Sequence, residues 1–213
     1  MSVVELMVGI TIGLFILAGA TTVATTQLGD SKRLMLEAQV QQDLRLTMDI
    51  MTRDLRRAGY WGRTDLEVWP QTINSALVNP YSPLTSTSSS IQFIRSTDED
   101  TGLLGTAEDT AVGASEYGGF RYNSTDQTLE MRIGGANTWQ TLTDRNVLQI
   151  TGFTVALNQI RKPVDGMLGV GNCPLNQTIS DADIQIQARA THDAAVTRTL
   201  RATVRLRNDL VGC

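Results

Sequence analysis

Residues 1–29, MSVVELMVGITIGLFILAGATTVATTQLG, hold a single ionisable side chain, Glu5, and the next one along the chain is Asp30. A helix of about 20 apolar residues crosses a bilayer, so this stretch is long enough to span a membrane. A carboxylate in such a helix costs roughly 2.5–3.5 kcal/mol at the bilayer centre on insertion scales. Glu5 therefore needs either a partner or a position near the membrane edge.

Charged residues are unevenly distributed along the 213-residue chain, whose net charge is −4. Residues 30–63 hold seven basic and five acidic side chains, whereas residues 64–213 hold eleven basic and sixteen acidic ones. This acidic balance argues against nucleic acid as the main partner. The length suits a membrane segment and one moderate domain.

The apolar helix is expected to continue to about Arg57, because no proline occurs before Pro70. Beyond Asp30, apolar residues recur at steps of three and four, which predicts one buried stripe on a charged helix. The stripe consists of Leu36, Val40, Leu44, Met48, Met51, Leu55 and Ala58. Gly59 is suited to end the helix.

Two glycines in the apolar segment are candidates for helix packing. Gly9 and Gly13 form a GxxxG pair, which allows a second helix to approach closely. The alternative is that both face lipid, since small residues are common in membrane spans. Residues 13–26 are rich in glycine and threonine, and local bending or melting of the helix is expected to be easiest there.

Residues 60–90 are interpreted as a long irregular connection, since they hold three of the five prolines and a Ser/Thr run. Strands are expected at 91–95, 120–123, 128–133, 138–142, 147–157, 183–191 and 199–207. The last two alternate between apolar and polar residues and would form a hairpin around residues 192–195. The pattern predicts an α+β protein in which a long N-terminal helix packs on an antiparallel β-sheet.

The two cysteines, Cys173 and Cys213, lie in the last fifth of the chain. An even number of cysteines behind a membrane span favours a disulfide between them in an oxidising compartment. The alternative is two free thiols.

No catalytic site or cofactor site is evident, because the only histidine, His192, falls in an expected turn. Asp98 and Asp100 are weak calcium candidates, because the run DEDTG does not match an EF-hand loop. A solvated acidic loop is the simpler interpretation. Gly118 and Gly119 are interpreted as turn glycines rather than a phosphate cradle.

The stretch SVVELMVGITIGLFILAG resembles the mature start of type IV pilins, which have a glutamate at the fifth position. The helix end RDLRRAGYWG, the tract LEMRIGG…WQTLTDRNVLQITGFTVAL and the terminal VRLRND are similar to the minor pilins called PilW. The resemblance implies a lollipop-shaped subunit. Residues 1–29 would form the membrane or filament-core half of the helix, 30–58 its amphipathic half, and 59–213 a β-rich head.

The resemblance also implies how the subunit is used. A prepilin peptidase would cut before residue 1 and methylate the new amine of Met1, where the family usually has phenylalanine. The subunit would wait in the bacterial inner membrane with its head in the periplasm. It would then stack with others through the N-terminal helices, so that Glu5 of one subunit meets the amine of another.

The function implied by the resemblance is structural, with no enzymatic activity. The chain would be a minor pilin of the complex that initiates a type IV pilus and sits at its tip on the cell surface, with roles in adhesion and twitching motility. Its partners would be other minor pilins, the major pilin and a tip adhesin.

Two other functions are weighed against this one. A minor pseudopilin of a type II secretion system shares both the glutamate and the architecture. A membrane-anchored periplasmic enzyme or binding domain that never polymerises would give Glu5 no role in assembly.

Overall fold

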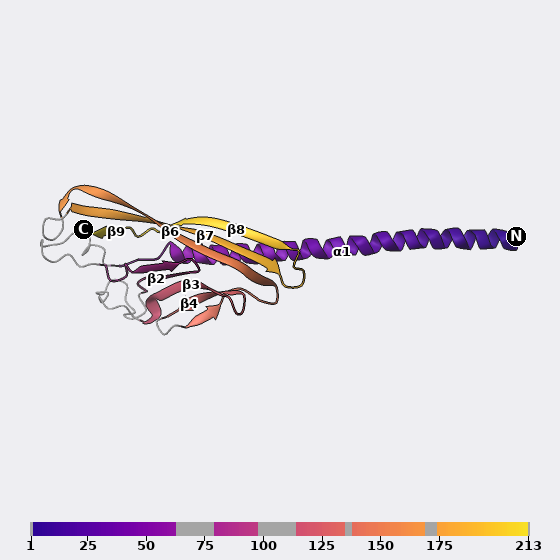
Figure 1. Cartoon of the computed structure of the whole chain (residues 1–213), viewed down its shortest axis with the longest axis horizontal. Coiled ribbons are helices and arrows are strands. Elements are labelled where there is room, and N and C mark those ends of the chain that lie inside the picture. The colour runs from indigo at the N-terminus through magenta and orange to yellow at the C-terminus, as the bar shows by residue number, and fades with distance from the viewer. Residues whose placement is uncertain (1, 63–78, 98–113, 135–137, 169–173, 213) are drawn as a thin grey trace.

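The computed structural model describes residues 2–62, 79–97, 114–134, 138–168 and 174–212. Its longest element is α1, Val3–Leu55, a continuous α-helix of 53 residues. At 1.5 Å per residue the helix is about 80 Å long. Its N-terminal half extends alone, and its C-terminal half lies among the strands (Figure 1). The sequence expectation of one long helix is confirmed, and α1 is continuous through residues 13–26.

The strands form two antiparallel sheets rather than one. The first has the order β1-β2-β3-β4-β5, made of Leu84–Thr87, Ser90–Ile94, Tyr117–Asn123, Thr128–Ile133 and Trp139–Thr141. A 3-10 turn, η2 (Ala114–Glu116), leads into β3. The second has the order β6-β7-β8, made of Leu148–Leu168, Pro174–Ala190 and Thr197–Arg205, and β9 (Leu210–Gly212) pairs with β7. The two sheets lie on different sides of the C-terminal half of α1 (Figure 1).

The core lies between this half of the helix and the inner faces of both sheets. Six of the seven predicted stripe residues are buried, and Leu36 is half-buried. They pack with inward residues of β7 and β8, such as Ile184, Ile186 and Val204, and with Ile91, Phe93, Phe120 and Leu129 of the first sheet. Burial of each such side chain contributes roughly 1.5–3 kcal/mol. The helix therefore supplies one wall of the head's own core.

The predicted hairpin of the last alternating segments is confirmed. β7 and β8 pair antiparallel, with Ile186 opposite Leu200 and Ile184 opposite Ala202. The expected inward residues Ile184, Ile186, Ala188 and Ala190 are all buried. Period-two alternation was a reliable signal here because one face of this sheet meets the helix and the other meets solvent.

Several elements differ from the expectation. β6 runs to Leu168 and β7 begins at Pro174, so their hairpin is much longer than the segments 147–157 and 183–191. β1 falls within the segment interpreted as irregular, and β9 was not anticipated. In the arm of the β6–β7 hairpin, residues 158–163 are exposed irrespective of which face they occupy. Such a strand shows no alternation of polar and apolar residues, so the pattern could not reveal it.

Gly118 and Gly119 do not form a turn but lie inside β3. A side chain at Gly118 would place its Cβ 2.6 Å from the ring of Phe93. The glycine therefore makes room for an aromatic residue of the neighbouring strand, whose ring lies 6.3 Å from that of Phe120.

Candidate functional site

The N-terminal half of α1 presents apolar side chains on every side, and none of them is buried. Phe15 is 82% exposed and Val3 74% exposed. The best 18-residue window has a mean hydropathy of 2.2, so the helix is long and apolar enough to cross a membrane. A helix that is apolar all round is stable in a membrane or in a core shared with other chains.

Threonine hydroxyls in this half are satisfied within the helix. Thr11, Thr21, Thr22 and Thr25 each donate a hydrogen bond to a backbone carbonyl three residues earlier, at 2.8–2.9 Å. Because the hydroxyls bond to the helix itself, they need no water, which suits an apolar environment. This explains how a segment of low helix propensity can remain helical away from water.

Glu5 lies in the first turn of α1 and is exposed. Its carboxylate oxygen Oε2 accepts a hydrogen bond from the backbone N–H of Ser2 at 3.4 Å. The partial positive charge at a helix N-terminus favours an anion there. Within the described part of the chain, Glu5 therefore has only a long, local contact, and its carboxylate is exposed.

Gly9 and Gly13 lie on the same exposed segment. A Cβ added at either position would meet no other atom within 4 Å. The surface around them is open to a second helix, and their role in helix packing stays a prediction.

Charged side chains join the middle of the helix to the head. Glu37 accepts hydrogen bonds from Arg198 of β8 at 2.5 Å and from Arg33 at 3.3 Å. Closer to the end of the helix, Arg95 Nη1 lies 3.2 Å from Asp54 Oδ1. These ion pairs fix where the helix emerges from the head and how it is rotated.

The C-terminal end of the helix is held by the head through backbone groups. Gly59 has a φ of 72° and donates its N–H to the carbonyl of Ile94 at 2.8 Å. Asn208 Nδ2 donates to the carbonyl of Ala58 at 2.8 Å, and Asn79 Nδ2 donates to that of Gly59 at 3.1 Å. These contacts satisfy carbonyls that a helix end leaves unpaired. The sequence predicted the stop at Gly59 but carried no signal for the two asparagines.

Among the residues that the structure describes, Asp43 of α1 and Glu130 of β4 have carboxyl groups with shifted pKa values. Burial, with the nearby carboxylate of Asp144, raises the pKa of Asp43. For Glu130, burial alone would raise the pKa, but hydrogen bonds from Asn123 and Arg121 and the charge of Arg121 lower it overall. Arg121 Nε lies 2.6 Å from Glu130 Oε2. Both groups have structural surroundings rather than those of a catalytic cleft.

Several candidates from the sequence lie outside the described residues, namely Met1, Cys173, Cys213, Asp98 and Asp100. The disulfide, the mature N-terminus and the weak calcium candidates therefore stay predictions. Within the described ranges, no group of three or more His, Cys, Asp or Glu side chains could hold a metal ion. His192 is exposed in the turn between β7 and β8.

A comparison with family models matches residues 33–206 to the family described as "Prepilin peptidase-dependent protein B". Comparisons with curated proteins and with solved structures give no significant match. The matched range covers the amphipathic half of α1 and nearly all of the head, so it is independent of the N-terminal pilin motif. The chain, which combines a long apolar N-terminal helix with antiparallel sheets, belongs to the prepilin peptidase-dependent protein B family.

Proposed function

We propose that the chain is a minor pilin, a structural subunit of the complex that initiates a type IV pilus and sits at its tip. The observation that carries the proposal is Glu5, a lone exposed carboxylate in an apolar helix that continues without interruption into the core of the head. The family description supports processing by a prepilin peptidase and a structural rather than catalytic role.

In this proposal, Glu5 sets the axial register between the stacked helices of neighbouring subunits. In the bilayer an unpaired carboxylate is unfavourable, whereas pairing with the amine of a neighbouring subunit compensates its charge. The hydrogen bond from Ser2, at 3.4 Å, is long enough to be exchanged for a charged donor. Membrane storage is then the less favourable state and the assembled helix bundle the more favourable one.

The test compares Glu5→Gln and Glu5→Leu with Asp30→Asn, which removes the next acidic group on the same helix. Pilus number and the amount of this chain in sheared pili are measured in cells that carry each variant. Both Glu5 variants are expected to reduce incorporation strongly, while Asp30→Asn leaves it near the wild-type amount. Unchanged incorporation in the Glu5 variants would exclude assembly through this residue and favour a membrane-anchored domain that does not polymerise.

A minor pseudopilin of a type II secretion system is the second candidate, because the family description names dependence on a prepilin peptidase and does not distinguish between the two machines. Deletion of the gene separates the two functions. Loss of pili with normal protein secretion supports the minor pilin, and loss of secretion with normal pili supports the pseudopilin.

A further inference from the structure

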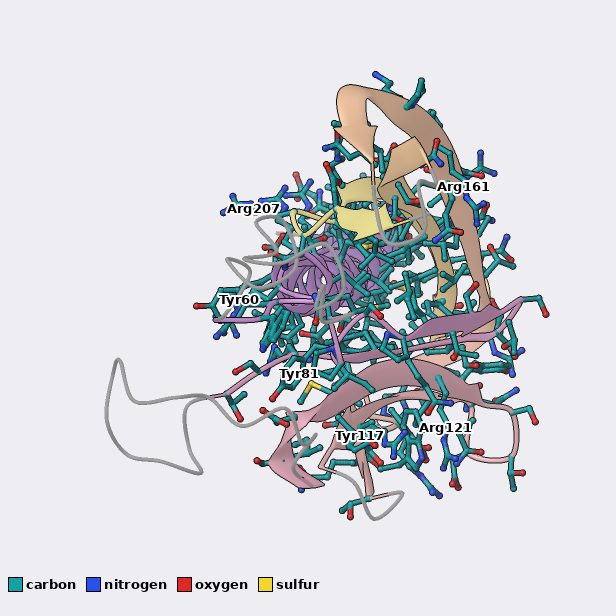
Figure 2. All side chains as sticks on the ribbon, turned by 90° about the vertical axis from the view of Figure 1, so that its left-hand side faces the viewer. Tyr60, Tyr81, Tyr117, Arg121, Arg161 and Arg207 are labelled. Atoms are coloured by element: carbon teal, nitrogen blue, oxygen red, sulfur yellow. The ribbon has the colours of Figure 1, made fainter. Side chains whose placement is uncertain are left out.

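Four arginines gather around one pocket where α1 ends within the head. The pocket has a volume of about 630 Å³ and is lined by Arg56, Arg57, Tyr60, Arg95, Ser96, Thr97, Arg207 and Asn208. These residues come from three separate parts of the chain, namely the end of α1, the segment after β2 and the segment after β8. Figure 2 views the head from the side opposite the helix N-terminus and shows Tyr60 and Arg207 on the same side of the helix.

The positive charge of this arginine pocket is mostly uncompensated. Arg95 pairs with Asp54. Arg56, Arg57 and Arg207 are exposed and make no ion pair within the described part of the chain. Guanidinium groups bind carboxylates and phosphates with two parallel hydrogen bonds, so three unpaired ones around a pocket favour an anionic ligand.

Two residues that line the pocket have buried hydroxyls without a hydrogen-bond partner. Ser96 is 3% exposed, and its hydroxyl has no hydrogen-bond partner among the described residues. The Thr97 hydroxyl is in the same situation. Buried polar groups are normally paired, and an unpaired one costs roughly 1–3 kcal/mol. Both hydroxyl oxygens are buried and so are not accessible from the pocket, and the three exposed arginines carry the inference of an anionic ligand.

We propose that this arginine pocket binds an acidic segment of a partner protein, through side-chain carboxylates of Asp or Glu. One arginine of the pocket already binds a carboxylate in this way, because Arg95 Nη1 lies 3.2 Å from Asp54 Oδ1. That the partner is another protein of the tip complex rests on the proposed function, whereas the binding chemistry does not.

Position and charge disfavour other anions. The pocket begins at Arg56, so it lies about 40 Å along the helix from residue 29, the end of the apolar segment, and is beyond the reach of lipid headgroup charge at a Debye length of about 8 Å. A long polyanion would also meet the rest of the head, where residues 64–213 carry sixteen acidic and eleven basic side chains. A short run of carboxylates in an otherwise neutral segment avoids that repulsion.

Binding is tested with the full chain in detergent micelles and a fluorescein-labelled hexaglutamate peptide, followed by anisotropy at 0.15 M salt. Hexaglutamine serves as the neutral control peptide. The double variant Arg57→Gln/Arg207→Gln is expected to weaken hexaglutamate binding about tenfold or more, since it removes two charge-assisted donors. The matched variant Arg161→Gln/Arg201→Gln removes the same charge from exposed strand positions and is expected to change binding less than about threefold.

Four outcomes would overturn the proposal. They are no binding by the wild type, equal losses in the two double variants, stronger competition by inorganic phosphate than by hexaglutamate, and displacement of the peptide by anionic vesicles.

A variant with Asp98→Asn, Glu99→Gln and Asp100→Asn removes acidic residues that follow Thr97 in the sequence. Binding seen only in this variant would assign the pocket to the chain's own carboxylates and would also refute the proposal.

A photo-crosslinking residue placed at Tyr60 extends the test to cells. The cross-linked partner segment is expected to contain Asp or Glu residues, and its yield should fall at least about tenfold when Arg57→Gln/Arg207→Gln is added.

The Glu5→Gln chain should bind hexaglutamate as the wild type does. Normal peptide binding together with normal pilus incorporation of Glu5→Gln would refute the proposed function while leaving the pocket intact.

Discussion

Arg198 Nη2, on β8, lies 2.5 Å from Glu37 Oε2, in the middle of α1. The two residues are 161 positions apart in the chain, so this ion pair fixes the helix against the last long strand of the head. Glu37 also accepts a hydrogen bond from Arg33, one helical turn earlier. The helix leaves the head at this point, because residues 2–35 are exposed.

Removal of either partner of this ion pair is expected to destabilise the head only slightly. Glu37→Gln and Arg198→Gln should each lower the free energy of unfolding by about 0.2–1 kcal/mol, because both side chains remain partly exposed to water. The double variant should lose no more than the larger single effect. Chemical unfolding in detergent measures this cycle, and fully additive losses would show that the two residues do not interact.

Burial of the helix stripe is expected to dominate the stability of the head. Met51 has no exposed surface. Met51→Ala should lower the free energy of unfolding by about 2–5 kcal/mol through lost contacts and a residual cavity. Leu46→Ala, at a position on the same helix that is 61% exposed, serves as the control and should change it by less than about 0.5 kcal/mol. Equal effects at the two positions would contradict the described packing.

The conformation of Gly59 predicts a cost for any side chain there. Gly59→Ala places a Cβ on a residue with a φ of 72°, which should cost about 1–2 kcal/mol. Gly29→Ala is the contrasting change, since Gly29 is helical and a Cβ there meets nothing within 4 Å. It should be neutral or stabilising by up to about 1 kcal/mol. Unfolding curves for the two variants distinguish the cap from a general effect of glycine replacement.

The raised pKa of Asp43 predicts a pH-dependent effect of its removal. A carboxyl whose pKa is higher in the folded state contributes its stability below the unfolded pKa and loses it as pH rises through the folded value. Asp43→Asn removes the buried charge and its repulsion by Asp144. The variant should therefore be more stable than the wild type at neutral pH, and this difference should shrink as the Asp43 carboxyl becomes protonated in acid.

The measurement for Asp43 is the unfolding midpoint of wild type and variant between pH 3 and pH 8. Asp49→Asn, an exposed position on the same helix, provides the control with the same chemical change. A difference between wild type and Asp43→Asn that stays constant with pH would show that the carboxyl does not carry the effect.

The sequence was informative wherever one side of an element is buried and the other is not. The stripe from Leu36 to Ala58 and the alternation around Ile184 and Ile186 both record contact with a core, so they predicted the helix and its hairpin. Leu84–Thr87 and the hairpin arm around Ile160 are strands by backbone pairing while their side chains remain partly or fully exposed. Pairing of this kind leaves little trace in the pattern of apolar residues.

The candidate sites show the same division. Glu5 could be found from the sequence because a charge in an apolar segment is conspicuous by itself. The arginine pocket could not, because Arg57, Arg95 and Arg207 belong to distant segments that only the fold brings together. Asn79 and Asn208 were missed for the same reason, since their partners are backbone carbonyls that carry no sequence signal.

The unbroken course of α1 has a mechanical consequence. A pull on the head is transmitted to the apolar N-terminal half along a single helix of 53 residues, with no linker between the two. Its hydrogen bonds run along the direction of tension, so each successive turn of the helix carries the full load. At its C-terminal end, the helix is held by the hydrogen bonds around Gly59 and packs against both sheets. The load therefore enters as shear across a wide interface. Force applied to the head therefore reaches the apolar half of α1 through the helix itself.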